Sequence, residues 1–174
     1  MTGASYKITV RDLEVTAALD RLRKEDGGLV PAALKNIGLQ LVKRWRRRMG
    51  EEKGPDGKAW APLNPEYKKG KKGAKILQEQ GMRGGLIGSL VSQVQGDQVA
   101  IGTNKVYGAV HQFGATITPR SADALMFRIN GRLVKAKAVR IPARPYLGVS
   151  EDDKVEIVQV VQDHIDRVWE GNGA

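Results

Sequence analysis

The sequence predicts an α+β fold: one domain over residues 1–174 in which amphipathic helices pack on an antiparallel sheet with two hairpins and a long loop. Three observations favour this class. Apolar residues recur at helical spacing over 31–49 and 150–169, and strand alternation flanks Gly96-Asp97 and Asn130-Gly131. Neither period persists over about 50–81, which predicts the loop.

The N-terminal part is expected to hold one strand and one helix. Apolar and polar residues alternate over 6–10, as in a short, half-buried strand. Asp12 is suited to cap a helix from Leu13 to about Glu25, which Gly27-Gly28 would end.

A second helix is predicted to open at Pro31. Its apolar stripe consists of Leu34, Ile37, Gly38, Leu41, Val42, Trp45 and Met49. The arginines at 44 and 46–48 are interpreted mainly as the solvated side of this helix. Arg48 lies nearer the stripe, where it either extends along the apolar surface or reaches a partner.

The loop over 50–81 begins with dense turn chemistry at residues 54–57. A loop of this length is uncommon in a compact domain unless it has a function or is disordered when free. Trp60, Leu63 and Tyr67 are apolar, so part of the loop is expected to pack on its own domain or on a neighbour. The lysine-rich stretch over 68–75 is expected to be mobile.

Two hairpins follow the loop. A short helical turn near Leu86 leads into a strand to Gln95, Gly96-Asp97 reverses the chain, and a brief helix is predicted over 106–113. Alternation over 125–129 and the Asn130-Gly131 turn predict the second hairpin, whose basic return strand runs over 132–140.

The last predicted helix starts after Ser150, whose hydroxyl caps it, and three acidic residues complement the positive end of its dipole. The residues expected to face inward are Val155, Val158, Val161, Ile165 and Val168.

Charge raises the question of a polyanionic partner. The chain has 29 Lys and Arg against 19 Asp and Glu, a formal net charge of +10. The basic clusters are interpreted as solvated faces and a mobile loop, or alternatively as contacts with nucleic acid or an acidic protein surface. The chain has no cysteine, which fits a reducing compartment, and no signal-like or membrane-spanning apolar run, so we expect neither secretion nor membrane insertion.

No residue pattern predicts catalysis. The imidazoles are His111 and His164, no serine has the Gly-x-Ser-x-Gly frame, and the glycine-rich stretch over 81–89 lacks a Walker lysine. We therefore expect no enzymatic activity, no metal and no cofactor.

Two particular segments remain. One is His111-Gln112-Phe113-Gly114, which is typical of a packed polar corner. The other runs over 141–148, where Pro142 and Pro145 hold Arg144 in extended backbone.

These two segments resemble the phage virion-morphogenesis family when they are taken in order with the turn at 54–57, Trp60, Pro62-Leu63, Ile76-Leu77, Gly81, residues 101–104 and Tyr107-Gly108. That family includes tail-completion proteins of Mu-like phages, and the resemblance covers about residues 30–170. It implies a non-enzymatic structural protein at the neck of a tailed phage or prophage. Such a protein would act as a ring subunit beside other neck and tail proteins, in the virion and in the host cytoplasm during assembly.

On this basis we assign two sets of residues. Those expected to contact another subunit or partner are Trp60, Tyr67, Arg132, Lys135, Lys137, Arg140 and Arg144. Arg144 is expected to donate to a backbone or carboxylate group of its own or a neighbouring subunit. Those expected to shape the subunit are Tyr107, His111, Gln112, Phe113, Gly114, Pro142, Pro145 and Tyr146. The alternative function is a basic nucleic-acid-binding accessory protein, whose non-specific DNA contact would weaken steeply with salt.

Overall fold

The computed structural model describes residues 29–71, 73, 75–78 and 84–171, together with 13, 16, 17 and 20. These last four residues are helical, as predicted for 13–25, whereas the predicted strand over 6–10 lies outside the described residues. The elements are α2 (Leu29–Gly50), α3 (Pro65–Gly70), α4 (Gly85–Gly88), β1 (Val91–Gln95), β2 (Gln98–Gly102), α5 (Gly108–Phe113), β3 (Ala115–Ile117), β4 (Leu125–Ile129), β5 (Arg132–Ala136), β6 (Val139–Ile141) and α6 (Glu151–Gly171).

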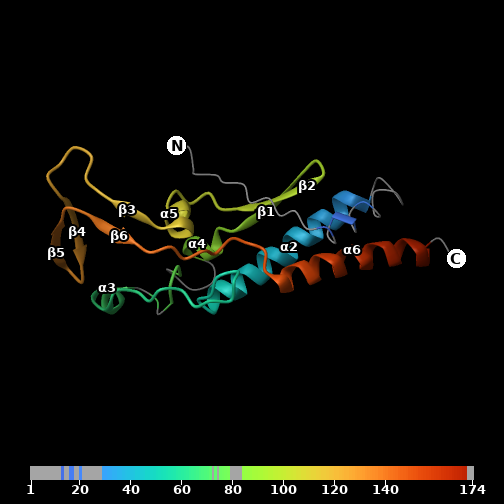
Figure 1. The fold of residues 1–174 in the computed structure, drawn as a ribbon, viewed down its shortest axis with the longest axis horizontal. Helices are drawn as coiled ribbons and strands as arrows, with labels where there is room; N and C mark the ends of the chain where they lie inside the picture. The colour runs from blue at the N-terminus through green and yellow to red at the C-terminus, as the bar shows by residue number, and fades with distance from the viewer. Residues whose placement is uncertain are drawn as a thin grey trace.

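The molecule is elongated, with the two long helices α2 and α6 toward one end and the β4–β5 hairpin and α3 at the other (Figure 1). At the helical end α2 lies between α6 and the β1–β2 hairpin, and it contacts both. At the opposite end β3 and β6 run out to the β4–β5 hairpin, which contacts α3. The predicted α+β class is confirmed.

Helix α2 supplies more of the core than any other element. All seven residues of its predicted stripe are buried, together with Val30 and Ala33. The helix begins at Leu29, so Pro31 lies in the first turn. Backbone N–H groups of the first turn have no acceptor within the helix, so a proline there costs no hydrogen bond. The β1–β2 hairpin approaches α2 closely at Gly38, where a Cβ would lie 2.7 Å from the Val99 side chain.

Helix α6 begins with a reciprocal cap. The Asp153 backbone N–H donates to Ser150 Oγ at 3.2 Å, and the Ser150 N–H donates to Asp153 Oδ2 at 3.0 Å. The buried face differs from the prediction: it consists of Asp153, Ile157, Val160, Val161 and His164. Val155 was predicted to face inward and is instead 58% exposed, because the buried Asp153 carboxylate sets the rotation of the helix.

Both predicted hairpins are present with the predicted turns. Gln95 pairs with Gln98 around Gly96-Asp97, and Ile129 pairs with Arg132 around Asn130-Gly131. Asn130 and Gly131 both have left-handed φ, 51° and 79°, as a two-residue turn of this kind requires.

The predicted single sheet and continuous basic return strand are corrected by the structure. The described strands form three separate two-stranded antiparallel ladders, β1–β2, β3–β6 and β4–β5. The ladder of the second hairpin ends where Leu125 pairs with Ala136, and Val139 instead pairs with Ile117. Pro119 lies between the two ladders, where the chain leaves one pairing and enters the other.

The loop over 50–81 contains structure that the sequence pattern did not predict. Helix α3 lies within it, and the Asn64 side chain accepts from the N–H groups of Glu66 and Tyr67. Lys68 and Lys69 of the stretch predicted to be mobile form its last turn. Trp60 and Ile76 are buried in the core, so the loop packs on its own domain at these two positions.

Candidate functional site

The two particular segments of the sequence meet each other in space. Gln112 of α5 is buried, and its side-chain oxygen accepts from the backbone N–H groups of Tyr146 and Leu147, each at 3.0 Å. Its amide nitrogen donates to the Leu147 carbonyl at 3.0 Å. One side chain thus forms hydrogen bonds with three backbone groups of Tyr146 and Leu147, which belong to no strand. Without Gln112 these buried backbone groups would lose these hydrogen-bond partners. We call this contact between residues 108–114 and 141–148 the motif crossing.

Close backbone approach fixes the rest of the motif crossing. The Arg144 N–H donates to the His111 carbonyl at 2.7 Å. Gly114 has φ 73° and ψ 162°, a conformation that is essentially reserved for glycine, and a Cβ there would lie 2.9 Å from the Ala143 nitrogen. Tyr146 is fully buried, and a Cβ at Gly108 would lie 2.7 Å from its hydroxyl.

The segment over 141–148 also ties down the start of the long loop. Arg144 Nε donates to the Ala61 carbonyl at 2.9 Å, and Nη2 donates to the Pro62 carbonyl at 3.1 Å. Trp60 Nε1 donates to the Pro145 carbonyl at 2.9 Å. Burial lowers the pKa of Arg144 from its usual value, partly offset by the charge of Glu52 and by Tyr67. Trp60 and Arg144, both predicted as partner contacts, are buried within their own chain.

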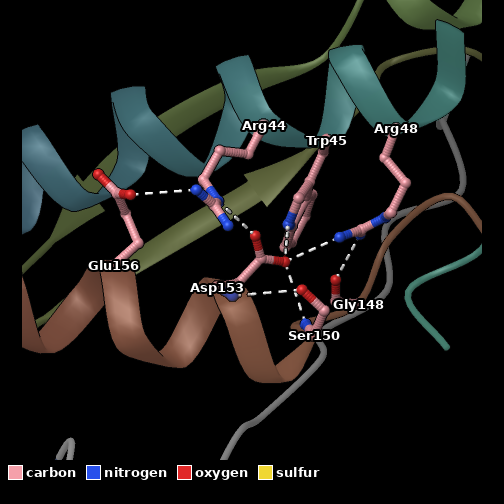
Figure 2. A network of polar contacts seen from close by, with 7 residues as sticks. All are labelled: Arg44, Trp45, Arg48, Gly148, Ser150, Asp153 and Glu156. Carbon is pink, nitrogen blue, oxygen red and sulfur yellow. Dashed lines mark hydrogen bonds and ion pairs between the residues drawn. The ribbon is translucent and has the colours of Figure 1, made fainter. Parts of the chain in front are cut away.

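A second polar network, centred five residues after the motif crossing, joins α2 to α6 (Figure 2). Its centre is the carboxylate of Asp153, a residue that is 1% exposed. Oδ1 accepts from Arg44 Nε at 2.8 Å, and Oδ2 accepts from Arg48 Nη1 at 2.8 Å and Trp45 Nε1 at 3.0 Å. Burial acts to raise the pKa of Asp153, but the Ser150 N–H and the two guanidinium groups outweigh it and lower the pKa to about 2.

The network extends to both sides of Asp153. Arg48 Nη2 donates to the Gly148 carbonyl at 2.7 Å, which links the network to the end of the motif crossing. Arg44 Nη1 donates to Glu156 Oε2 at 3.1 Å. The Asp153 hydrogen bond raises the pKa of Arg44 against the opposing effect of burial. Asp153 therefore stays ionised at neutral pH and holds two arginines of α2 in place.

This network corrects the interpretation of the arginine cluster as a solvated face. Arg44 and Arg48 bind Asp153, and Arg46 Nη2 donates to the Leu90 carbonyl at 2.7 Å. Among these arginines Arg47 is the one on the exposed side. Asp153 was treated as a helix-end charge, although the Ser150-x-x-Asp153 capping pattern could have indicated a fixed carboxylate.

The two histidines occupy packed positions. His111 meets the Tyr107 ring edge-on, with 5.9 Å between centroids, and its buried Nδ1 has no hydrogen-bond partner among the described residues. Burial, and then the charge of Arg144, lower its pKa, so the imidazole is neutral at pH 7. His164 Nδ1 lies 2.8 Å from the Val160 carbonyl, one turn earlier in α6.

In the described part of the chain, His, Asp and Glu side chains form no group of three or more that could hold a metal ion. None of the helices in that part combines the length and hydropathy that a membrane crossing requires.

Residues 115–141, which we call the basic arm, comprise β3 to β6. Six basic residues and one acidic residue give the basic arm a net charge of +5. None of its residues belongs to the buried core. Of the predicted contact residues, Tyr67 is 47% exposed on α3, and the exposed members in the arm are Arg132, Lys135, Lys137 and Arg140.

Residues 10–166 match the model of the phage virion morphogenesis family. The chain belongs to this family. Membership assigns it a structural role in the formation of phage particles. The resemblance predicted from the motifs is thereby confirmed.

Two relatives of the virion morphogenesis protein come from Haemophilus influenzae (strain ATCC 51907 / DSM 11121 / KW20 / Rd). Mu-like prophage FluMu G protein 1 is 32% identical over 114 residues, which is 63% of this chain and 62% of the relative. Mu-like prophage FluMu G protein 2 is 30% identical over 79 residues, which is 45% of this chain and 46% of the relative. Both matches cover less than two thirds of the relative's length. No solved structure matches the chain significantly.

Proposed function

We propose that this virion morphogenesis protein is a subunit of a ring at the neck of a tailed phage or prophage, where it completes the tail for head attachment. Family membership supports a role in particle formation. The observation that carries the finer proposal is the basic arm, which extends from the domain without contributing to its core.

The basic arm has the properties of a segment that binds another protein. A two-stranded hairpin is marginally stable by itself in water, because it buries little apolar surface. The β4–β5 hairpin nevertheless exposes Met126 by 63% and Leu133 by 58%. Exposed apolar side chains grouped on one element are typical of interaction surfaces. A neighbouring protein copy or neck component would cover them.

The motif crossing gives the basic arm a rigid base. Strand β6 ends at Ile141 and continues directly into the segment that Gln112 and His111 hold by backbone hydrogen bonds. Arg144 and Trp60 bind the same segment to the long loop. A base fixed in this way presents the arm at a defined angle, which lowers the entropy lost when a partner binds.

The proposal is tested by removing the gene from the phage or prophage that carries it and imaging the lysate by electron microscopy. We expect filled heads and separate tails to accumulate, and added purified chain to restore joined particles. Joined, infectious particles formed in normal yield without the chain would contradict the proposal.

The alternative, an accessory protein that binds nucleic acid, is favoured by one observation. The segments over 58–75 and 115–141 together hold 12 basic and two acidic residues, so they account for the whole net charge of +10, and the rest of the chain is balanced at 17 of each sign. The two segments meet where the Asn130 side chain donates to the Glu66 carbonyl. Duplex binding that falls steeply between 50 and 200 mM salt, roughly 10³-fold or more, would support this alternative.

A further inference from the structure

We propose that the β4–β5 hairpin of one copy docks on the outward face of α6 in the next copy. This inference rests on the proposed ring and names the two surfaces that form its subunit contact. The occupant of the exposed hairpin face is therefore a second copy of the same chain.

The hairpin surface alternates apolar and basic side chains. On the face turned away from Phe127 and Val134, Met126 pairs with Lys135, and Arg128 pairs with Leu133. All four side chains of this face are exposed. The face thus offers two apolar side chains, each flanked by a cation, and contains no acidic residue.

The outward face of α6 has the complementary composition. Five residues recur on it at helical spacing and all are exposed: Asp152, Val155, Gln159, Asp163 and Asp166. Val155 is the apolar residue of this face; Asp152 precedes it, and Asp163 and Asp166 follow it. The helix as a whole has seven acidic residues and two basic ones. Both basic residues, Lys154 and Arg167, lie off this face.

The two surfaces cannot meet within one molecule. The hairpin lies at one end of the elongated fold, and α6 turns its outward face away from α2 along the other end (Figure 1). Contact between unlike surfaces of identical copies is head-to-tail, and such a contact generates a closed ring when its rotation closes. Opposite charges at its rim would steer the copies together and fix their register.

A nucleic acid is the rival occupant of the hairpin face, and it fits the observations less well. Phosphate groups would pair with Arg128 and Lys135, but they would leave Met126 and Leu133 uncovered. They would also give no role to the acidic face of α6 or to the exposed Val155. A second copy accounts for both surfaces.

Charge reversal in the full chain tests the contact, with self-association measured at low salt by analytical ultracentrifugation. We expect Arg128→Glu with Lys135→Glu to weaken association by about tenfold or more, and Asp152→Lys with Asp163→Lys to do the same. The variant with all four reversals restores the opposite-charge pairing, so we expect its affinity to return to within about threefold of the wild type. The matched control is Lys35→Glu with Lys43→Glu, which reverses two exposed lysines of α2 and leaves association unchanged. Circular dichroism checks that each variant is folded.

The contact is overturned if the wild type stays monomeric, if either reversal leaves association unchanged, or if the fourfold variant is not restored. Loss of duplex binding on arm reversal, with association unchanged, would assign the hairpin face to nucleic acid instead. The neck function is judged separately from particle joining in the gene-removal experiment. If the charge reversals show no contact but heads and tails still fail to join without the chain, the interface is refuted and the neck function stands.

Discussion

Trp45 and Asp153 are 108 residues apart in the chain and are joined by a buried 3.0 Å hydrogen bond from the indole nitrogen to the carboxylate. The same carboxylate accepts from Arg44, Arg48 and the Ser150 N–H (Figure 2). It therefore fixes the packing of α2 against α6 and, through Arg48 and Gly148, the end of the motif crossing. Because this buried acid accepts from so many donors, removing its charge should lower the stability of the fold.

Replacing Asp153 by Asn should destabilise the fold by about 3 kcal/mol, because it leaves Arg44 and Arg48 without their shared counter-charge in a buried site. The free energy of unfolding is measured by urea titration followed by circular dichroism. Asp152→Asn is the matched control, since the neighbouring carboxylate is exposed in the first turn and interacts with the helix dipole, so its loss should change stability by no more than about 1 kcal/mol. Equal effects of the two substitutions would refute the role given to Asp153.

Acid should destabilise the protein through the same residue. The pKa of Asp153 is lowered from 3.8 to about 2 in the folded state, so the folded state binds this proton less readily than the unfolded state. The stabilisation is present above pH 3.8 and is lost as the pH falls toward 2; it amounts to about 2 kcal/mol. Urea titrations between pH 5 and pH 2 should show this loss in the wild type and a smaller loss in Asp153→Asn. Parallel profiles would contradict the prediction.

Gln112→Glu should make the motif crossing sensitive to pH. The carboxylate keeps the two N–H contacts from Tyr146 and Leu147, but it replaces the amide donor by an acceptor facing the Leu147 carbonyl. We expect the free energy of unfolding to fall by about 2 kcal/mol at pH 8. The decrease should be smaller at pH 5, because the buried carboxyl binds a proton there and donates again. Melting temperatures at the two pH values measure this effect. Gln112→Leu, which does not titrate, should be destabilised equally at both.

Gly114→Ala should destabilise the junction between α5 and β3. The residue has φ 73°, and its added Cβ would lie 2.9 Å from the Ala143 nitrogen and 3.1 Å from the Ile141 carbonyl oxygen. Backbone atoms on both sides cannot move away easily, so we expect a loss of about 2 kcal/mol or more in the urea titration. Gly102→Ala is the control, because a Cβ there meets no atom within 4 Å. A stable Gly114→Ala protein would show that this approach is not required.

Local patterns predicted much of this fold from the sequence. The α2 stripe, both hairpin turns and the cap at Ser150 depend on residues within a few positions of each other, and the structure has each of them. The pairing of Arg44 and Arg48 with Asp153 depends on the packing of two helices about 100 residues apart, which local periodicity does not contain. The rotation of α6 was missed for the same reason, since burial of Asp153 outweighs the inward pattern centred on Val155.

The site was predicted less completely. The sequence singled out His111, Gln112 and Arg144. It could not show that His111 and Gln112 form hydrogen bonds with the segment that contains Arg144. The sequence left open whether Trp60 packs on its own domain or on a neighbour, and in the structure its indole donates to the Pro145 carbonyl inside the chain. The break between β5 and β6 was also missed, because the mixed apolar and basic composition continues through residues 132–140 while the pairing partner changes.

Removing the outer part of the basic arm should separate folding from assembly. Ile117 pairs directly with Val139, so an Asn-Gly turn in place of residues 118–138 would close the β3–β6 ladder as an ordinary hairpin. No residue of the removed segment lies in the buried core, so we expect the free energy of unfolding to change by less than about 1 kcal/mol. The shortened chain should stay folded, lose self-association and fail to restore particle joining in the gene-removal lysate. A shortened chain that unfolds would show that the arm stabilises the domain, and one that still joins heads to tails would show that the arm is not the assembly surface.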